Sequence, residues 1–179
     1  QHYDVISAWI KATRASDPDA SLYYLAVMLE AGEDARFIAR RMVILASEDI
    51  GGADPQSLVV AVAASQAVQL VGMPEAVHAL AQCAVHLSLA PKSNAAYVAI
   101  AAARQHVRDH GAAVPPPYLR SANRREDGYD YPHDHPGHLT RQDVMPPALS
   151  GTRFFLPDAA EAASAARLAA LRQGRGAAG

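Results

Sequence analysis

Very short breaks divide residues 4 to about 110 into successive apolar segments, and this feature constrains the fold of the chain most strongly. Asp17-Pro18 and Asp54-Pro55 each place a carboxylate acceptor before a proline. This arrangement is typical of a helix start, because proline has no N–H to leave unpaired there. Glycines, which readily adopt the left-handed conformation of a C-terminal cap, follow where the helices should end, at Gly32, Gly51, Gly52, Gly72 and Gly111. The sequence therefore predicts several helices in close succession.

Apolar residues between these breaks recur at helical spacing. The sets are Leu22, Leu25 and Leu29, then Ile38, Met42 and Leu45, then Val59, Ala63, Ala67 and Leu70, then Val77, Leu80, Ala84 and Val85. Half of the residues are hydrophobic but only 6% are aromatic, and the abundance of alanine favours helices over sheets. Because such short breaks make consecutive helices roughly antiparallel, we expect an all-α fold of stacked helical hairpins, about six helices in all.

The composition changes after Gly111. Prolines are frequent between residues 112 and 156, which leaves little room for regular structure. We expect a long loop rich in proline and histidine, followed by an alanine-rich helix at about 158–172. The chain thus divides into a helical core, 1–111, and a segment, 112–179, that we expect to pack on the core through its aromatic residues.

Charge and cysteine content exclude several classes of protein. The formal net charge of −2 lacks the basic excess typical of a nucleic-acid-binding domain. The single cysteine, Cys83, lies on a probable core face and offers neither a disulfide nor a C-x-x-C motif. Apolar runs are too short to span a membrane, so we expect a cytoplasmic protein with no membrane partner. The chain starts at Gln1 without a methionine, and we expect a fragment of a longer protein.

Motifs for catalysis are not recognisable in this sequence. Lys92-Ser93 has the last two residues of a phosphate-binding loop without the preceding glycines. We interpret Ser93 as a helix cap with Lys92 exposed, and keep Lys92 and Asn94 as alternative contacts for a ligand or partner. Glu48-Asp49 is interpreted as a solvated helix end. We therefore expect no catalytic residue, no bound cofactor and no small-molecule substrate.

The histidine-rich loop is the most metal-like stretch of the chain. His133, Asp134, His135 and His138 supply nitrogen and oxygen donors at short range, and zinc could accept three such ligands. Two prolines restrict their geometry, and neighbouring loop histidines are commonly surface residues. We expect no native metal here, with His133, His135 and His138 as the candidates if a small metal-dependent hydrolase were present.

Two clusters of arginine are candidate interaction sites. Arg40 and Arg41 are expected to form salt bridges within the chain, for example with Glu48, and contact with another subunit is the alternative. Arg120, Arg124 and Arg125 lie in the proline-rich segment. We interpret them as a solvated loop that could alternatively contact phosphate.

Several blocks of residues follow one another in an order that is typical of a known family. They are His2–Ala8, Ser16–Ala20, Gly32–Asp34 with Ile38–Arg41, Ala46–Gly51, Ala53–Pro55, Gly72–Glu75, Ala90–Tyr97 and Tyr129–Asp134. In this combination the sequence resembles the C-terminal domain of the MgsA/RarA family of replication-associated recombination AAA+ ATPases, which are related to clamp loaders.

The resemblance implies a helical domain like the collar of clamp loaders, which joins subunits into a homotetramer. It implies a DNA-dependent parent ATPase that acts at stalled replication forks, near the nucleoid, in replication, recombination and repair. ATP and Mg would be bound by the parent's N-terminal half, and DNA and fork proteins would be partners of the full-length protein. The expected function is therefore non-catalytic oligomerisation. The alternative is a surface for DNA or a partner protein, built on Lys92, Arg120, Arg124 and Arg125, with assembly secondary.

Overall fold

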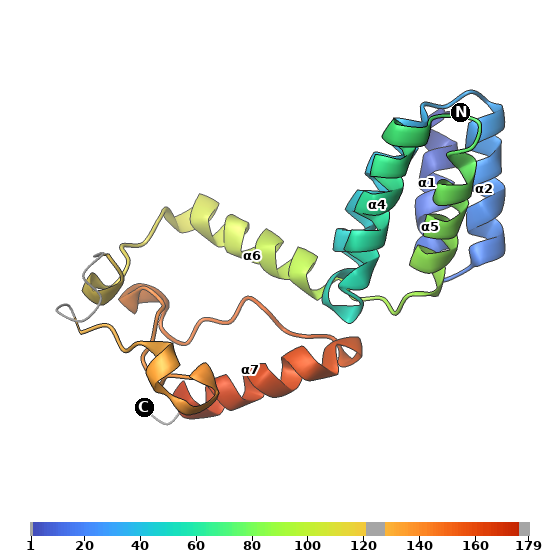
Figure 1. The fold of residues 1–179 in the computed structure, drawn as a ribbon. Coiled ribbons are helices and arrows are strands. Elements are labelled where there is room, and N and C mark those ends of the chain that lie inside the picture. The colour runs from blue at the N-terminus through green and yellow to red at the C-terminus, as the bar shows by residue number, and fades with distance from the viewer. Residues whose placement is uncertain (1, 121–127, 176–179) are drawn as a thin grey trace. The chain divides into compact units, whose positions relative to one another are not determined.

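The computed structural model describes residues 2–120 and 128–175. All regular structure in these ranges is helical, as the sequence predicts (Figure 1). The α-helices are α1 (His2–Arg14), α2 (Pro18–Glu30), α3 (Ala35–Leu45), α4 (Gln56–Val71), α5 (Val77–Leu89), α6 (Ala95–His110) and α7 (Ala162–Arg175). The chain forms two compact units, Gln1–Val98 and Ala99–Gly179, which meet within α6.

Side-chain caps fix the starts of three helices. The Asp17 carboxylate accepts a hydrogen bond from the Ala20 amide at 2.9 Å, with Pro18 as the first helical residue. Asp34 caps α3 through the Arg36 amide, and the Ser93 hydroxyl accepts from the Ala95 amide at the start of α6. The predicted caps at Asp17 and Ser93 are thus confirmed, whereas α4 begins one residue after Pro55.

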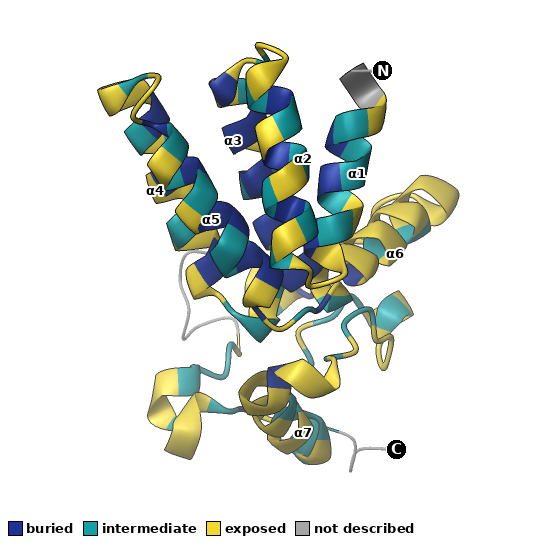
Figure 2. Ribbon diagram, turned by 90° about the vertical axis from the view of Figure 1, so that its right-hand side faces the viewer, coloured by how far each residue is buried: buried dark blue, intermediate teal, exposed yellow. Residues whose placement is uncertain are grey.

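The core of the first unit is built from five helices. Helix α1 packs on α2 and α3 packs on α4, while α5 contacts both α2 and α4 and so joins the two pairs. Figure 2 shows the buried positions on the facing sides of these helices. The chain turns from α3 toward α4 through a π-helical turn at Ala46–Ile50. The largest buried side chains are Trp9, Ile38, Met42, Leu45, Ile50, Leu80 and Leu87.

Cys83 lies within this core, where its side chain is almost fully buried. Burial raises the pKa of its thiol to about 12, because the charged thiolate is poorly solvated there. The thiol is therefore un-ionised near neutral pH and a poor nucleophile. This confirms the prediction that Cys83 occupies a core face.

The orientation of α4 differs from what its apolar spacing suggested. Its buried positions include Ala61, Ala64 and Val68, whereas Val59 and Leu70, which lie on the stripe that the sequence marks as apolar, are exposed. Small side chains therefore face α3 and α5, and larger aliphatic side chains face outward. A close approach of helices requires small residues at the contact, which explains why the alanine side of α4 is the buried one.

The second unit contains most of α6, short 3-10 turns and α7. Turns at Pro117–Leu119, Pro132–Asp134, Pro136–His138 and Pro147–Leu149 interrupt the proline-rich segment. Side chains bonded to the main chain hold this segment: Gln142 binds the Asp130 amide and the Gly128 carbonyl, and Arg172 donates to the Phe155 carbonyl at 2.7 Å. None of the described helices is long and apolar enough to cross a membrane.

Candidate interaction site

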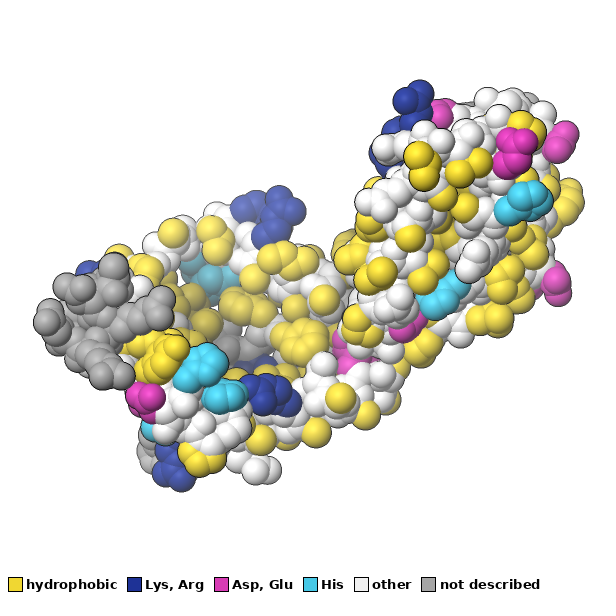
Figure 3. All heavy atoms as spheres, viewed as in Figure 1, with side chains coloured by type: hydrophobic (Ala, Val, Ile, Leu, Met, Phe, Trp, Pro, Cys, Tyr) yellow, Lys and Arg dark blue, Asp and Glu magenta, His cyan; other side chains and the backbone are white. Residues whose placement is uncertain are grey.

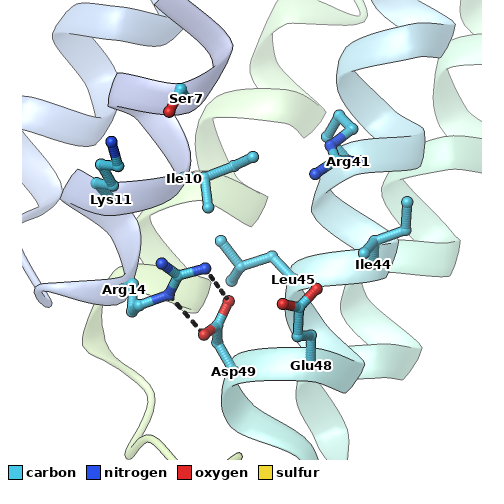
Figure 4. Close-up of a pocket in the computed structure, with 9 residues that line it drawn as sticks. All are labelled: Ser7, Ile10, Lys11, Arg14, Arg41, Ile44, Leu45, Glu48 and Asp49. Atoms are coloured by element: carbon cyan, nitrogen blue, oxygen red, sulfur yellow. Dashed lines mark hydrogen bonds and ion pairs between the residues drawn. The ribbon is translucent and has the colours of Figure 1, made fainter. Parts of the chain in front are cut away.

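A pocket of about 180 Å³ lies between α1 and α3 in the first unit (Figure 4). Helix α1 contributes Ser7, Ile10, Lys11 and Arg14 to one wall, and α3 with the following π-helical turn contributes Arg41, Ile44, Leu45, Glu48 and Asp49 to the other. The pocket therefore gathers three cations and two carboxylates over an aliphatic floor.

Arg14 and Asp49 form the one ion pair within this lining that the structure shows. Arg14 Nε donates to Asp49 Oδ1 at 2.6 Å and Nη2 donates to Oδ2 at 3.3 Å. The Asp49 side chain is only 10% exposed, and its hydrogen bond raises the pKa of Arg14 further above its usual value. Two parallel hydrogen bonds fix both groups in orientation, so Arg14 and Asp49 neutralise each other and tie α1 to the turn after α3.

Arg40 and Arg41 behave differently from each other. Arg40 is exposed and places its guanidinium carbon 5.9 Å from the centre of the Phe37 ring. Arg41 extends from α3 into the pocket, where its Nε atom is buried and has no hydrogen-bond acceptor among the described residues. Within the described ranges no ion pair joins either arginine to Glu48, so the salt bridge expected from the sequence is wrong.

Lys92 is engaged within the chain rather than exposed. Its Nζ donates to the Ser88 and Ala90 carbonyls at 2.8 and 2.6 Å and to the Ser16 hydroxyl at 3.0 Å. Desolvation lowers the pKa of Lys92. The lysine thus binds carbonyl groups at the C-terminal end of α5. The negative end of the helix dipole favours a cation at this position. Asn94 is exposed, and its main-chain carbonyl accepts the Val98 amide in the first turn of α6.

The predicted arginine cluster of the second unit is described only at Arg120. Its Nε donates to the Pro115 carbonyl at 2.7 Å, so it closes a local turn. Arg124 and Arg125 lie outside the described residues. A role for this cluster in binding DNA stays a prediction.

The three candidate metal ligands have other contacts in the structure. The rings of His133 and His138 lie 4.6 Å apart, and His133 also contacts the Tyr131 ring. His135 Nε2 hydrogen-bonds Asp130 and thereby lowers the pKa of that carboxyl group. Within residues 2–120 and 128–175 no group of three or more metal-ligating side chains is suitably placed to hold an ion.

A serine, a histidine and an aspartate meet where α4 begins and α5 ends. The Ser57 hydroxyl donates to Asp54 Oδ2 at 2.7 Å, and His86 Nε2 lies 3.0 Å from the same oxygen and 3.1 Å from the hydroxyl. In a hydrolytic triad the histidine uses one nitrogen for serine and the other for aspartate. Here a single nitrogen faces both groups, so the cluster ties two helices together and cannot relay a proton between them.

The Asp54 cluster predicts a pH-dependent contribution to stability. The Ser57 hydrogen bond, followed by that of His86, lowers the pKa of Asp54. The ionised Asp54 carboxylate therefore stabilises the fold above the pKa that Asp54 has in the unfolded chain, and this contribution is lost as the pH falls through its pKa in the folded chain. We expect Asp54→Asn to lower the free energy of unfolding at pH 7, and the difference from the native chain to shrink by about pH 3. Urea unfolding at both pH values measures it, with exposed Asp19→Asn as the control, and a difference independent of pH would contradict the interpretation.

Two helices expose apolar side chains. On α4, Val59, Val62 and Leu70 are 58%, 40% and 88% exposed, and we call this stripe the α4 face. Figure 3 shows hydrophobic side chains at the surface of the unit that contains α4. On α6, Ile100 and Val107 are each more than half exposed, and no described helix of the second unit makes an extensive contact with α6. These two residues share one side of the helix by their spacing, and we call it the α6 face.

The sequence did not point to the pocket, because its walls come from residues far apart in the chain. Arg14 and Asp49 are separated by 35 positions, and no local spacing pairs them. The α4 face was recognisable as an apolar stripe, but its exposure was not.

Known proteins resemble the chain over most of its length. The family model "MgsA AAA+ ATPase C terminal" matches residues 15–172. An AAA domain-containing protein of Mycobacterium tuberculosis is 51% identical over 164 residues, which cover 88% of this chain and 36% of that protein. The replication-associated recombination proteins A of Haemophilus influenzae and Escherichia coli are 42% and 41% identical over 163 residues, 87% of this chain and 36% of each relative.

The chain therefore spans about a third of the length of these relatives. The match of the family model to most of the chain agrees with the helical architecture and with the blocks of residues that resemble the MgsA/RarA family. The chain belongs to the family of C-terminal domains of MgsA AAA+ ATPases.

Proposed function

We propose that this domain is a non-catalytic self-association module of a DNA-dependent AAA+ ATPase that acts at stalled replication forks. The relatives named as replication-associated recombination proteins support the setting in replication, recombination and repair. ATP and Mg would bind elsewhere in the parent protein, and DNA and fork proteins would be partners of that parent. This domain would hold its copies together as a tetramer in the cytoplasm.

The α4 face carries the proposal. Helix α4 has sixteen residues, and none of them is Asp, Glu, Lys or Arg. An exposed helix of a monomer normally has a charged or polar outer side, whereas the centre of a protein interface is depleted in charge and rich in apolar groups. The outer side of α4 also has the exposed polar residues Gln66 and Gln69, but its lack of charge and its exposed aliphatic side chains resemble the composition of an interface.

A second copy of the chain is the occupant that fits this face best. Two copies related by a two-fold axis present the same patch to each other, and an uncharged patch meets itself without repulsion between like charges. The α6 face is a separate apolar surface, and two different faces are what a closed assembly of four copies needs. Lys92, which the alternative DNA-binding surface requires, is engaged with three acceptors of its own chain.

A charge placed on the α4 face tests the proposal. We expect Leu70→Glu or Val59→Glu to raise the dissociation constant for self-association by at least about 30-fold, because an unpaired carboxylate buried in an interface costs about 2 kcal/mol or more. Sedimentation equilibrium measures the constant. Leu70 is almost fully exposed within one chain, so the substitution should leave the helical fold and its thermal stability unchanged.

Tyr23→Glu is the matched control. Tyr23 is a 64% exposed aromatic residue on α2. Helix α5 contacts both α2 and α4 and so links these two helices. Tyr23 is therefore on a different helix from the α4 face. Equal weakening by Tyr23→Glu and Leu70→Glu would contradict a specific α4 interface. Salt-sensitive binding of fork DNA by a chain that stays monomeric would favour the alternative function instead.

A further inference from the structure

Arg41 is the unusual feature of the pocket between α1 and α3. Its Nε atom is buried without a hydrogen-bond acceptor among the described residues. A buried donor that lacks a partner costs about 1–3 kcal/mol, more when the group is charged, and such groups in native proteins call for an explanation such as a ligand. Arg41 is one of the residues that line a pocket of about 180 Å³, so an acceptor in the pocket can approach its guanidinium group.

The charges around Arg41 define what that acceptor would be. Arg14 and Asp49 neutralise each other through two hydrogen bonds. The remaining charged groups of the lining are Lys11, Arg41 and Glu48, which leave one positive charge in excess. A group with a single negative charge would balance the pocket, whereas a cation would meet two positive groups.

The donors come from two walls rather than one plane. Lys11 and Ser7 are on α1, and Arg41 is on α3 across the gap (Figure 4). A planar carboxylate accepts best from donors in its own plane, as in a fork-to-fork pair with arginine. A tetrahedral phosphate presents oxygens in several directions, and both lysine and arginine are common phosphate ligands.

We propose that this pocket binds one phosphate group, with Lys11 and Arg41 as its charged ligands and Ser7 as a neutral hydroxyl beside them. The Arg41 guanidinium group donates to one phosphate oxygen and the Lys11 ammonium to another. The Arg14–Asp49 pair holds the wall of the pocket and does not bind the phosphate. This site is separate from the α4 face and does not depend on self-association.

The side-chain Nε–Hε resonance of Arg41 provides a direct test. We expect it to shift saturably when the ¹⁵N-labelled 179-residue chain is titrated with inorganic phosphate, with a midpoint in the millimolar range, roughly 1–10 mM, at constant ionic strength set by chloride. The signal is assigned by its loss in Arg41→Gln. A shift that is linear in phosphate and equal to that in chloride alone would overturn the proposal.

Matched variants separate binding from general charge effects. Lys11→Gln removes an exposed lysine and should weaken phosphate binding at least about 5-fold, the loss of one charge-assisted hydrogen bond. Arg40→Gln removes the neighbouring exposed arginine of the same helix and should change the affinity less than about 2-fold. Equal effects of the two variants would overturn the proposal, and this comparison holds even if Arg41→Gln fails to fold.

A second titration with a short DNA duplex identifies the source of the phosphate. A shift of the Arg41 resonance at duplex concentrations far below those needed for inorganic phosphate, with steep weakening by salt, would place a phosphodiester of DNA in the pocket. A shift with inorganic phosphate alone would point to a free phosphate or a phosphorylated small molecule. Neither titration reports on oligomeric state, so failure here is distinguishable from failure of the proposed self-association.

Discussion

Trp9→Ala is expected to lower the free energy of unfolding by about 3–5 kcal/mol, a large part of the stability of a domain of this size. Trp9 lies on α1 with no exposed surface. Its removal would leave a cavity beneath the helix that also supplies Ser7, Lys11 and Arg14 to the pocket. Chemical denaturation measures the loss, and a change below about 1 kcal/mol would show that Trp9 is not a core residue.

Trp9→Phe is the informative comparison. The Trp9 Nε1 atom is buried and has no acceptor among the described residues. Phenylalanine removes this unpaired donor, which offsets part of the lost contact area. We therefore expect Trp9→Phe to cost less than about 1.5 kcal/mol, and a loss as large as that of Trp9→Ala would indicate that the indole N–H is satisfied in the folded chain.

Thr13→Val should destabilise the domain by about 1–3 kcal/mol, although the two side chains have nearly the same shape. Thr13 donates from its hydroxyl to the Trp9 carbonyl at 2.9 Å and lies 2.8 Å from the Ser21 hydroxyl of α2, and both side chains are fully buried. Because Thr13 already donates to Trp9, Ser21 must donate to Thr13. Valine leaves the Ser21 hydroxyl buried without an acceptor.

A double-mutant cycle checks this prediction. Ser21→Ala removes the stranded donor, so the pair Thr13→Val with Ser21→Ala should be more stable than Thr13→Val alone, by about 1 kcal/mol. Denaturation of the four chains under one set of conditions provides the cycle. Additive losses would mean that the two hydroxyls do not depend on each other.

Local rules predicted the fold, since caps and helical spacing act within a few residues. Asp17 and Ser93 cap helices where expected, and Gly72, at a positive φ of 74°, ends α4. The final helix runs Ala162–Arg175, a few residues later than predicted, because Asp158 and Glu161 form a capping box over a 3-10 turn first. The orientation of α4 was not predicted, because the helix has no charged residue and its exposed Gln66 and Gln69 lie among apolar residues, so they mark its exposed side only weakly.

The contacts of the candidate site were less predictable than the helices. Lys92 was expected at the surface, but its ammonium bonds Ser16, which is 76 residues away in the chain. Arg40 and Arg41 were expected to form salt bridges within the chain, for example with Glu48, but Arg40 is exposed and Arg41 lines the pocket. Such contacts depend on which helices become neighbours, and a single sequence does not show this for residues so far apart.

The molar mass of the isolated chain in solution is the most direct test of its self-association. Static light scattering over a range of concentrations should give about 76 kDa, four times the 19.0 kDa of one chain, with dissociation only at low concentration. A mass that stays at that of one chain at high micromolar concentration would contradict the account, because the α4 and α6 faces would then remain exposed to water.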